Sequence, residues 1–438
     1  MTPPAGPGFR MLLWVYDLLM ELAVWLLLVP LHRLWQGLGR HGPDVLAQRL
    51  GRAPLPTVEG RPRILLHAVS VGETAAAAPI GAELARLLPQ ACILVSSGNG
   101  DGAKAAQALA APQPHWEAIG LLPWDRRRAL DAWLGRLAPD LVVVMETELW
   151  PNLFWGCQRL GIPLALANGR VYPKDLAGYR LLRPLMGPVL ACLDWVGAQD
   201  GAEAQRLAAI GVPWERIQVT GNSKLDRVEA RLGPSADLGP GPLIVAGSTH
   251  PPEERWLLDA LEQLARDGLE LRLLLAPRQP RRAGRLAAAA RRRGRRPVLW
   301  SEWQGGPDWD LLILDRIGPL GACYGAADLV FLGGSLVRRG GHNPAEPAAW
   351  GRPILVGPHT EHFQSMMAGL ETVGGLLRVS HQHQLAPLFS TLLADAGRRQ
   401  ALGQAARHWL LDQDGAAARQ ALALADLLRA PLVTPSKK

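Results

Sequence analysis

A carboxylate stands just after the first predicted strand, where the sequence HAVSVGETAAAAPI passes from strand to helix. The strand reaches Ala68, and Glu73 follows at the start of an Ala-rich helix. A carboxylate there can act as a general base that removes a proton from an acceptor hydroxyl. It can equally be a first-turn acid that interacts with the helix dipole. Position alone favours the dipole role, and both roles stay open.

A second group of acids follows a buried strand in the segment METELWPN. The strand ends at Met145, and Glu146 and Glu148 precede a Trp-Pro helix start. Acids held close together at a strand end shift each other's pKa, although one of them can instead cap the next helix. Farther on, in VTGNSKLD, Lys224 follows a short strand and a glycine turn. A cation there can hold a phosphate or a leaving group, but loop lysines are more often simply solvated.

The strongest signal in the chain is the segment FLGGSLVRRGGHNPAEPAAWGRPILVGP in its second half. Its first glycines let the backbone approach a ligand, Asn343 can cap a helix opened by Pro344, and Glu346 lies in that helix's first turn. A helix N-terminus binds phosphate, and a carboxylate beside it can accept hydrogen bonds from ribose hydroxyls. Arg278 directly follows another strand, where its guanidinium can clamp a phosphate. These residues predict a nucleotide-sugar site.

Two further patterns imitate binding signatures. Asp308 and Asp310 form a DWD that resembles a metal-binding DxD, but a Gly-Gly-Pro turn precedes it and a strand follows, so we expect a solvated turn. The stretch Arg278–Arg296 contains nine arginines, as nucleic-acid-binding segments do. It has no interleaved aromatics, so a basic helix face near an anionic membrane is an equally good interpretation.

These residues are positioned by a regular alternation of short apolar runs and longer helical patterns, typical of parallel βαβ units. We expect strands at Ile64–Ala68, Cys92–Val95, Leu141–Met145, Leu164–Ala167, Trp195–Ala198, Leu243–Ala246, Leu271–Leu275, Leu311–Leu314, Leu329–Leu332 and Ile354–Val356. The Gly- and Pro-rich stretch RLGPSADLGPGP separates the two series. The pattern predicts an anchor at residues 1–40, an acceptor-side domain at 41–228, a linker at 229–242 and a nucleotide-sugar-binding domain at 243–430. Two doubly wound Rossmann-like domains would face a central cleft between their strand ends.

The first forty residues contain an apolar segment, Met11–Leu31, about as long as a bilayer-spanning helix. Asp17 and Glu21 lie four residues apart on one helical face, and acids are costly at bilayer depth. A simple span, an interfacial helix and a buried helix of a soluble protein therefore stay open. We expect the segment to be retained rather than cleaved. Basic residues follow it at Arg33, Arg40, Arg49 and Arg52, which predicts that the rest of the chain is cytoplasmic.

The composition is that of a folded protein with a basic surface. The chain has 438 residues, of which 48% are hydrophobic, enough to fill two cores. Lys plus Arg exceeds Asp plus Glu by 47 − 39 = 8, which suits nucleic acid, an anionic membrane or an acidic substrate. The cysteines lie far apart and form no CxxC, so neither a zinc site nor a disulfide framework is indicated. They are Cys92, Cys157, Cys192 and Cys323.

The motifs occur in an order that resembles one family, the transferases of Kdo, an acidic eight-carbon sugar. The matching segments are HAVSVGE, METELWPN, VTGNSK.D, GSTH..EE, PR.P.R, YGAAD, FLGGSLV.RGGHNPAEPA and GPHT..F, and they run through almost the whole chain. The resemblance implies a GT-B fold with an N-terminal membrane helix. It also implies CMP-Kdo as donor, and as acceptor a lipid A precursor at the cytoplasmic face of the inner membrane. It implies no metal or other cofactor and no nucleic-acid partner.

The resemblance also implies roles for individual residues. Glu73 would be the catalytic base, with Glu146 and Lys224 stabilising the transition state. The CMP contacts would be Pro277, Arg278, Ile317, Gly318, Pro319, Asn343, Pro344, Ala345 and Glu346. Two loops depart from the family pattern: Ser96–Ala103 reads SSGNGDGA, and Asp315–Gly321 has Pro319 where an acid is expected.

The primary hypothesis is therefore an inverting glycosyl transfer with Glu73 as base. No metal is required if Arg278, Lys224 and the helix start at Asn343 meet the charge of the leaving phosphate. One rival keeps the GT-B enzyme but changes its donor or acceptor. The other is a non-enzymatic binder of a membrane surface or of nucleic acid.

Overall fold

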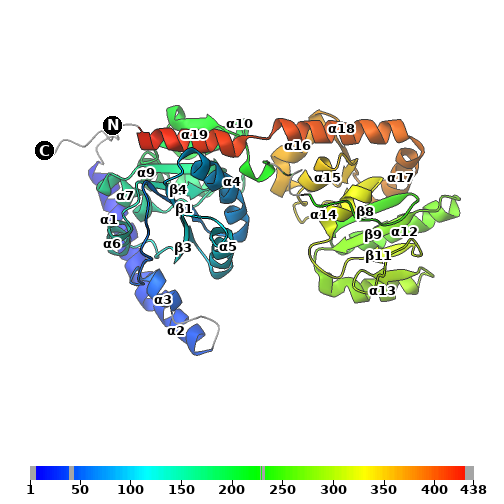
Figure 1. The fold of residues 1–438 in the computed structure, drawn as a ribbon, viewed down its shortest axis with the longest axis horizontal. Coiled ribbons are helices and arrows are strands. Elements are labelled where there is room, and N and C mark those ends of the chain that lie inside the picture. The colour runs from blue at the N-terminus through cyan, green and yellow to red at the C-terminus, as the bar shows by residue number, and fades with distance from the viewer. Residues whose placement is uncertain (1–5, 39–43, 227, 229–231, 430–438) are drawn as a thin grey trace. The chain divides into compact units, whose positions relative to one another are not determined.

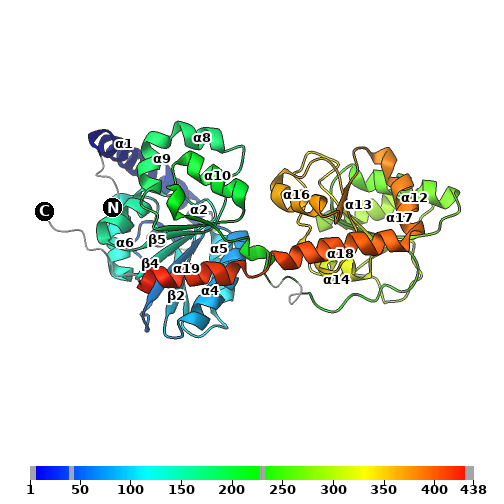
Figure 2. The same cartoon turned by 90° about the horizontal axis from the view of Figure 1, so that it is seen from above.

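The computed structural model describes residues 6–38, 44–226, 228 and 232–429. The chain divides into two compact units (Figures 1 and 2). The first unit comprises Met1–Asp226 and Gly415–Lys438, and the second comprises Arg227–Asp414. Some predicted segments lie partly outside the described residues. They are the anchor (residues 1–5 and 39–40, including Arg40), the linker (229–231) and the end of the second domain (residue 430).

In the described part of the first unit, seven parallel strands form one sheet in the order β3-β2-β1-β4-β5-β6-β7. The strands are β1 (Arg63–Ala68), β2 (Cys92–Ser97), β3 (Trp116–Leu121), β4 (Leu141–Met145), β5 (Leu164–Gly169), β6 (Trp195–Ala198) and β7 (Ile217–Val219). The central strands are apolar on both faces, because helices cover both sides of a parallel sheet. The order reverses at β1 and β4, which places a topological switch point between them.

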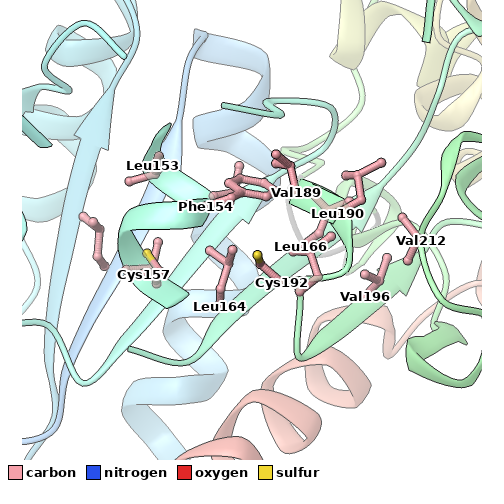
Figure 3. Close-up of a cluster of buried hydrophobic side chains, with 14 of the residues drawn as sticks. Leu153, Phe154, Cys157, Leu164, Leu166, Val189, Leu190, Cys192, Val196 and Val212 are labelled. Carbon is pink, nitrogen blue, oxygen red and sulfur yellow. The ribbon is translucent and has the colours of Figure 1, made fainter. Parts of the chain in front are cut away.

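Helices pack on both faces of this sheet. They are α3 (Asp44–Arg49), α4 (Val71–Leu87), α5 (Gly100–Ala110), α6 (Arg127–Leu137), α7 (Pro151–Leu160), α8 (Leu176–Leu181), α9 (Arg183–Leu190) and α10 (Gly201–Ile210), with 3-10 turns η2 (Trp214–Arg216) and η3 (Ser223–Leu225). Figure 3 shows one core layer, in which Phe154 and Cys157 of α7 pack with Leu166 of β5 and Val189 of α9. The described cysteine thiols are free and buried.

The described part of the second unit repeats this plan with strand order β10-β11-β9-β8-β12-β13-β14. Its strands are β8 (Leu243–Thr249), β9 (Arg272–Pro277), β10 (Pro297–Leu299), β11 (Leu311–Ile313), β12 (Leu329–Leu332), β13 (Ile354–Val356) and β14 (Leu376–Arg378). Its helices and turns are α12 (Glu253–Arg266), η4 (Pro280–Arg282), α13 (Ala283–Arg291), α14 (Leu320–Ala326), α15 (Ala345–Ala349), η5 (Glu361–Phe363), α16 (Gln364–Thr372), η6 (Gln382–Gln384), α17 (Leu385–Ala394) and α18 (Ala396–Asp412). The two parallel α/β units confirm the predicted fold class, and their facing across a cleft stays a prediction.

The C-terminal helix corrects the predicted domain boundary. The sequence pattern assigned residues 243–430 to the second domain, but α19 (Ala416–Arg429) belongs to the first unit. Figures 1 and 2 show α19, in red, beside α4. Asp226 explains the return, because its carboxylate accepts the backbone N–H groups of Ala416 (3.0 Å) and Ala417 (2.6 Å). It thereby satisfies two orphan donors at the start of α19.

The N-terminal segment is helical from α1 (Pro7–Ala23) through a π-helical segment, η1 (Val24–Leu28), to α2 (Val29–Gly37). Of the described residues, this helix alone is long and apolar enough to cross a membrane, with a mean hydropathy of 2.0. One edge of α1 binds the first unit through polar groups. Tyr16 donates to Asp125 at 2.8 Å, Glu21 pairs with Arg126 at 2.7 Å, and Asp17 accepts a backbone N–H at the start of α6 at 3.2 Å. The two acids that make a simple span costly are therefore paired with protein groups.

Phe9, Leu13, Val24 and Val29 of this helix are buried, but most of its other large apolar side chains are exposed to solvent. The exposed ones are Met11, Leu12, Trp14, Val15, Leu18, Leu19, Leu22, Trp25, Leu26, Leu27, Leu31, Leu34 and Leu38. An exposed apolar face of this extent is typical of a membrane or protein contact.

Candidate active site

The candidate acids of the first unit lie at its topological switch point. Strands β1 and β4 are hydrogen-bonded neighbours, and Glu73 and Glu146 follow their carboxyl ends. Ligands of open α/β sheets bind at such a point, because the loops diverge there and leave a crevice. The two acids are 73 positions apart in sequence, and parallel pairing places both at one sheet edge.

Glu73 lies in the first turn of α4 and is partly exposed. Its Oε2 accepts the Val69 N–H at 2.8 Å, and Ser70 Oγ donates to its Oε1 at 3.3 Å. The carboxylate therefore does stabilise the start of the helix, as its position suggested. Burial raises the pKa of Glu73, and the nearby charge of Glu146 raises it further, whereas the Val69 N–H and Lys224 oppose the shift. A raised pKa suits a base that works near neutrality.

Glu146 is held rigidly at the end of β4. Its side chain is buried, and its backbone has φ = 54°, a left-handed conformation that is uncommon for a residue with a Cβ. Oε1 accepts hydrogen bonds from Lys224 Nζ and from Asn168 Nδ2 (3.4 Å), and Oε2 lies 4.0 Å from a guanidinium nitrogen of Arg170. Backbone strain of this kind clusters at functional sites.

Lys224 reaches Glu146 from the turn η3, whose start is fixed by two side chains. Asn222 Oδ1 accepts the Lys224 N–H at 3.0 Å, and Asn168 Oδ1 accepts the Ser223 N–H at 3.0 Å. Asn168 thus orients both partners of the Glu146–Lys224 pair. The structure brings the three predicted residues of the first unit together, since the charges of Glu146 and Lys224 both act on Glu73.

Glu148, the second acid of METELWPN, and two residues with no role assigned from the sequence, Arg170 and Tyr172, also surround this cluster. Burial, followed by the charge of Glu73, raises the pKa of Glu148 to about 7. The guanidinium of Arg170 lies 4.0 Å from the ring centroid of Tyr172, and burial raises the pKa of that tyrosine. The signal for these residues was present, because METELWPN contains Glu148 and the turn after β5 contains the other two. Their side-chain directions were not readable from the motifs.

In the second unit, the predicted nucleotide contacts also follow strand ends. Arg278 comes directly after β9 and is exposed, its backbone N–H donates to Thr249 O at 3.0 Å, and no described carboxylate forms an ion pair with it. Its neighbour Pro277 is buried. Asn343 Oδ1 accepts the Ala345 N–H at 3.0 Å, but the N-cap of the short helix α15 is Pro344, so the helix begins one residue later than predicted and Asn343 precedes its cap.

Glu346 lies in the first turn of α15, as predicted, and partial desolvation raises its pKa. Its carboxylate lies close to the start of α14, because a Cβ added at Gly321 would be 3.4 Å from Oε2. The turn before α14 is open: Ile317 is 86% exposed, and Gly318 has φ = 121°. Pro319 then occupies the N-cap position. Pro344 and Ala345 are buried behind Glu346. The turn at 317–319 and the start of α15 are therefore neighbours.

A histidine pair that the sequence did not predict lies in the same unit. Nε2 of His250 is 3.1 Å from Nε2 of His342, and the rings are nearly parallel at 9°. Burial lowers the pKa of His342 to about 4, and the charges of His250 and Arg278 act in the same direction. Burial also lowers the pKa of His250, so both rings favour the neutral form, and the charge of Arg278 acts on both of them in the same direction.

Several residues of the DWD and of the arginine-rich stretch form ion pairs within the second unit. Asp308 pairs with Arg296 at 3.2 Å, and Asp310 lies 3.8 Å from Arg295. Arg282 and Arg293 of the arginine-rich stretch also pair with acids of the second unit. No group of three or more potential metal-binding side chains occurs among the residues that the structure describes.

Comparison with known proteins identifies the family. Residues 44–227 match the model of 3-deoxy-D-manno-octulosonic-acid transferase (kdotransferase). The chain is 31% identical over 397 residues to the 3-deoxy-D-manno-octulosonic acid transferase of Haemophilus influenzae, covering 88% of this chain and 90% of that one. It is 34% identical to the Bordetella pertussis enzyme of the same name, covering 86% and 89%.

A solved structure agrees on the fold. A glycosyltransferase from Rickettsia africae superposes with a TM-score of 0.55 at 13% identity, covering 85% of this chain and 99% of that one. At this identity the likeness concerns the fold alone. The full-length matches and the paired parallel α/β units together show that the chain belongs to the Kdo transferase family of GT-B glycosyltransferases.

Proposed function

We propose that the protein transfers Kdo from CMP-Kdo to a lipid A precursor, with inversion at the anomeric carbon and Glu73 as general base. One observation carries this proposal: a carboxylate with a raised pKa stands at the switch point beside the Glu146–Lys224 pair. A base must be deprotonated before transfer and must accept a proton readily during it.

The proposed step balances as follows. Glu73 takes the proton of an acceptor sugar hydroxyl while that oxygen forms a bond to the anomeric carbon of Kdo. The bond from this carbon to the phosphate oxygen breaks, and CMP leaves with the electron pair. The transition state resembles an oxocarbenium ion, and Glu146 and Lys224 would stabilise its developing charges from fixed positions. These side chains supply the acid–base chemistry of the step without a metal.

The second unit would bind the donor. Arg278 is exposed and has no described ion-pair partner, so its guanidinium is available to a phosphate. Glu346 can accept hydrogen bonds from ribose hydroxyls. The neighbouring turn, Ile317 to Pro319, would contact the rest of the nucleotide, together with the backbone from Asn343 to Ala345.

The N-terminal helix would bring the enzyme to its lipid acceptor. Asp17 and Glu21 are occupied by contacts with the first unit, so a transmembrane orientation of α1 would draw α6 towards the lipid. We therefore favour an interfacial helix whose exposed leucines enter one leaflet. The basic residues that follow the helix favour the cytoplasmic leaflet, and the proposed lipid A acceptor favours the inner membrane.

Mass spectrometry of the reaction products would test the proposal. Purified protein with CMP-Kdo and a lipid A precursor should yield the acceptor increased by one or more Kdo residues, together with CMP. Parallel reactions with UDP-sugars should yield no product. Transfer from a UDP-sugar but not from CMP-Kdo would contradict the proposed donor, and transfer only to another acceptor would contradict the proposed lipid.

A further inference from the structure

Two adjacent acids at the start of α12, Glu253 and Glu254, are almost fully buried. Their exposed fractions are 0% and 2%. Charged groups are rarely buried without partners, because removal from water is costly. Glu253 is about as buried as the core leucines of the unit, and the mechanism uses neither acid.

Glu253 is surrounded by backbone N–H groups from two separate segments. Its carboxylate accepts the N–H groups of His250 (2.9 Å), Gly334 (2.7 Å), Ser335 (3.1 Å) and Leu336 (3.0 Å). The first follows β8 and the other three follow β12. Strands β8 and β12 are hydrogen-bonded neighbours. The strand order reverses between them, so they form the switch point of the second unit. One carboxylate therefore joins the two loops that diverge there.

Glu254 holds a third segment, the loop that carries Arg278. Arg282 donates to both carboxylate oxygens, at 2.7 and 3.4 Å, and Thr249 Oγ1 donates to Oε1 at 3.3 Å. Thr249 in turn accepts the backbone N–H of Arg278. The loop from Arg278 to Arg282 is thus fixed at both ends, once through Thr249 and once through Arg282.

The segments are in direct contact where the carboxylates join them. A Cβ added at Gly333 would lie 2.5 Å from the Cα of Thr249, so only glycine fits there. The loops cannot be spaced apart by a side chain, and their relative position depends on the hydrogen bonds that cross between them. Neither acid faces a ligand, since both are surrounded by protein donors.

We propose that Glu253 and Glu254 are positioning residues for the nucleotide: together they hold the loops after β8, β9 and β12 in the arrangement that binds CMP. This inference rests on the proposed function, because it assumes that these loops bind the donor. Glu254 acts on Arg278 through Arg282 and Thr249, and Glu253 sets the backbone path of Gly334 to Leu336.

The number of donors around each side chain explains why both residues are carboxylates and not amides. A carboxylate accepts several N–H groups at once, whereas glutamine has one acceptor oxygen and an NH2 group that would face other donors. Glu253→Gln therefore leaves backbone N–H groups unsatisfied, and Glu254→Gln removes the paired contact with Arg282. Each change should weaken CMP binding about tenfold, a loss of about 1.4 kcal/mol.

Calorimetric titration of the full-length protein with CMP tests this, with melting temperature measured on the same samples. The variants are Glu253→Gln, Glu254→Gln, Arg282→Gln and the double variant Glu254→Gln/Arg282→Gln. The matched control is Asp259→Asn, because Asp259 lies on the same helix and pairs with Arg293 at the surface. Each single site variant should bind CMP about tenfold more weakly at temperatures where it is folded, and the control should bind normally.

The double variant separates positioning from general destabilisation. If Glu254 acts through Arg282, the double variant should bind CMP no more weakly than either single variant. In turnover assays the KM for CMP-Kdo should rise while kcat stays near normal, and the KM for the acceptor should not change. Should Glu253→Gln fail to fold, the Glu254 and Arg282 variants carry the test.

The outcomes are distinguishable. Lower melting temperatures with unchanged CMP affinity would show a purely structural role and overturn the inference. Additive losses in the double variant would overturn the action through Arg282. Absence of CMP binding by the unmodified protein would instead overturn the proposed function, on which the inference rests.

Discussion

Gln420 Oε1 accepts a hydrogen bond from the backbone N–H of Asn168 at 2.8 Å, across 252 positions of sequence. Gln420 lies on α19 and is fully buried. The Asn168 side chain in turn donates to the Glu146 carboxylate and accepts the backbone N–H of Ser223, the residue before Lys224. The C-terminal helix is therefore part of the support of the acid cluster, although it follows the whole second unit in sequence.

Replacing Gln420 with Ala should lower the free energy of unfolding by about 1–3 kcal/mol, because the Asn168 N–H is left buried without its acceptor. Turnover should also fall as the Glu146–Lys224 pair loses support. Urea denaturation and an activity assay measure both effects. Asp426→Ala on the same helix is the control, since its surface pair with Arg429 contributes little. Equal stability of the two variants would contradict the account.

Lys224→Met should lower the free energy of unfolding by about 2–4 kcal/mol at neutral pH, because it leaves the buried Glu146 carboxylate without its closest cation. The double variant Glu146→Gln/Lys224→Met should regain at least half of this loss but stay inactive. Denaturation and turnover on the same samples check this, with the exposed Lys104→Met as control. Restored turnover in the double variant would exclude a catalytic role for the pair.

The pH dependence of kcat/KM should show an acid limb, because protonated Glu73 cannot accept a proton. Burial raises the pKa of Glu73, so activity should be lost as pH falls through a value above the ordinary range of glutamate. Burial, followed by the charge of Glu73, raises the pKa of Glu148 to about 7, so Glu148 gains its charge around neutral pH. Glu148→Gln should leave the acid limb in place and increase activity above pH 7, where the new charge would repel an anionic donor. A shifted acid limb in this variant would contradict the assignment.

The triple replacement of Leu19, Leu22 and Leu26 with Glu should release the protein from anionic vesicles, because it places charges on the exposed face of the N-terminal helix. The contacts of Asp17 and Glu21 should survive, so the melting temperature should change little. Sedimentation with vesicles measures binding, and Leu411→Glu, at an exposed apolar position of the second unit, is the control. Continued sedimentation of the triple variant would show that another surface binds the membrane.

Much of the fold was predictable because parallel strands buried on both faces are continuous apolar runs. The predictions for β4, β6, β12 and β13 match the observed bounds. The edge strand β3 was missed, since Glu117 and Gly120 interrupt WEAIGL and leave no continuous apolar run. Strands β10 and β14 were missed because they are short and only partly buried, whereas the equally short β13 is apolar and buried throughout.

The site was predictable where its chemistry follows a strand end. Glu73, Glu146 and Arg278 could be found in this way, because sheet topology brings such ends to one edge. Gln420 could not, since a buried glutamine in a helix gives no local signal of a partner 252 positions away. Glu253 and Glu254 read as an ordinary acidic first turn, and only the structure shows that both fold back onto the loops.

The central claim is that Glu73 is the base, although it also accepts hydrogen bonds at the start of α4. Glu73→Gln separates the two roles, because an amide oxygen can still accept the Val69 N–H but cannot take a proton at working pH. Turnover of CMP-Kdo by this variant, measured with its CMP affinity and melting temperature, is the most direct test. If Glu73 is the base, the rate should fall about a hundredfold or more, with affinity and stability nearly unchanged. Near-normal turnover with a stability loss of roughly 0.3–1 kcal/mol would show that Glu73 only stabilises the helix start, and would contradict the mechanism.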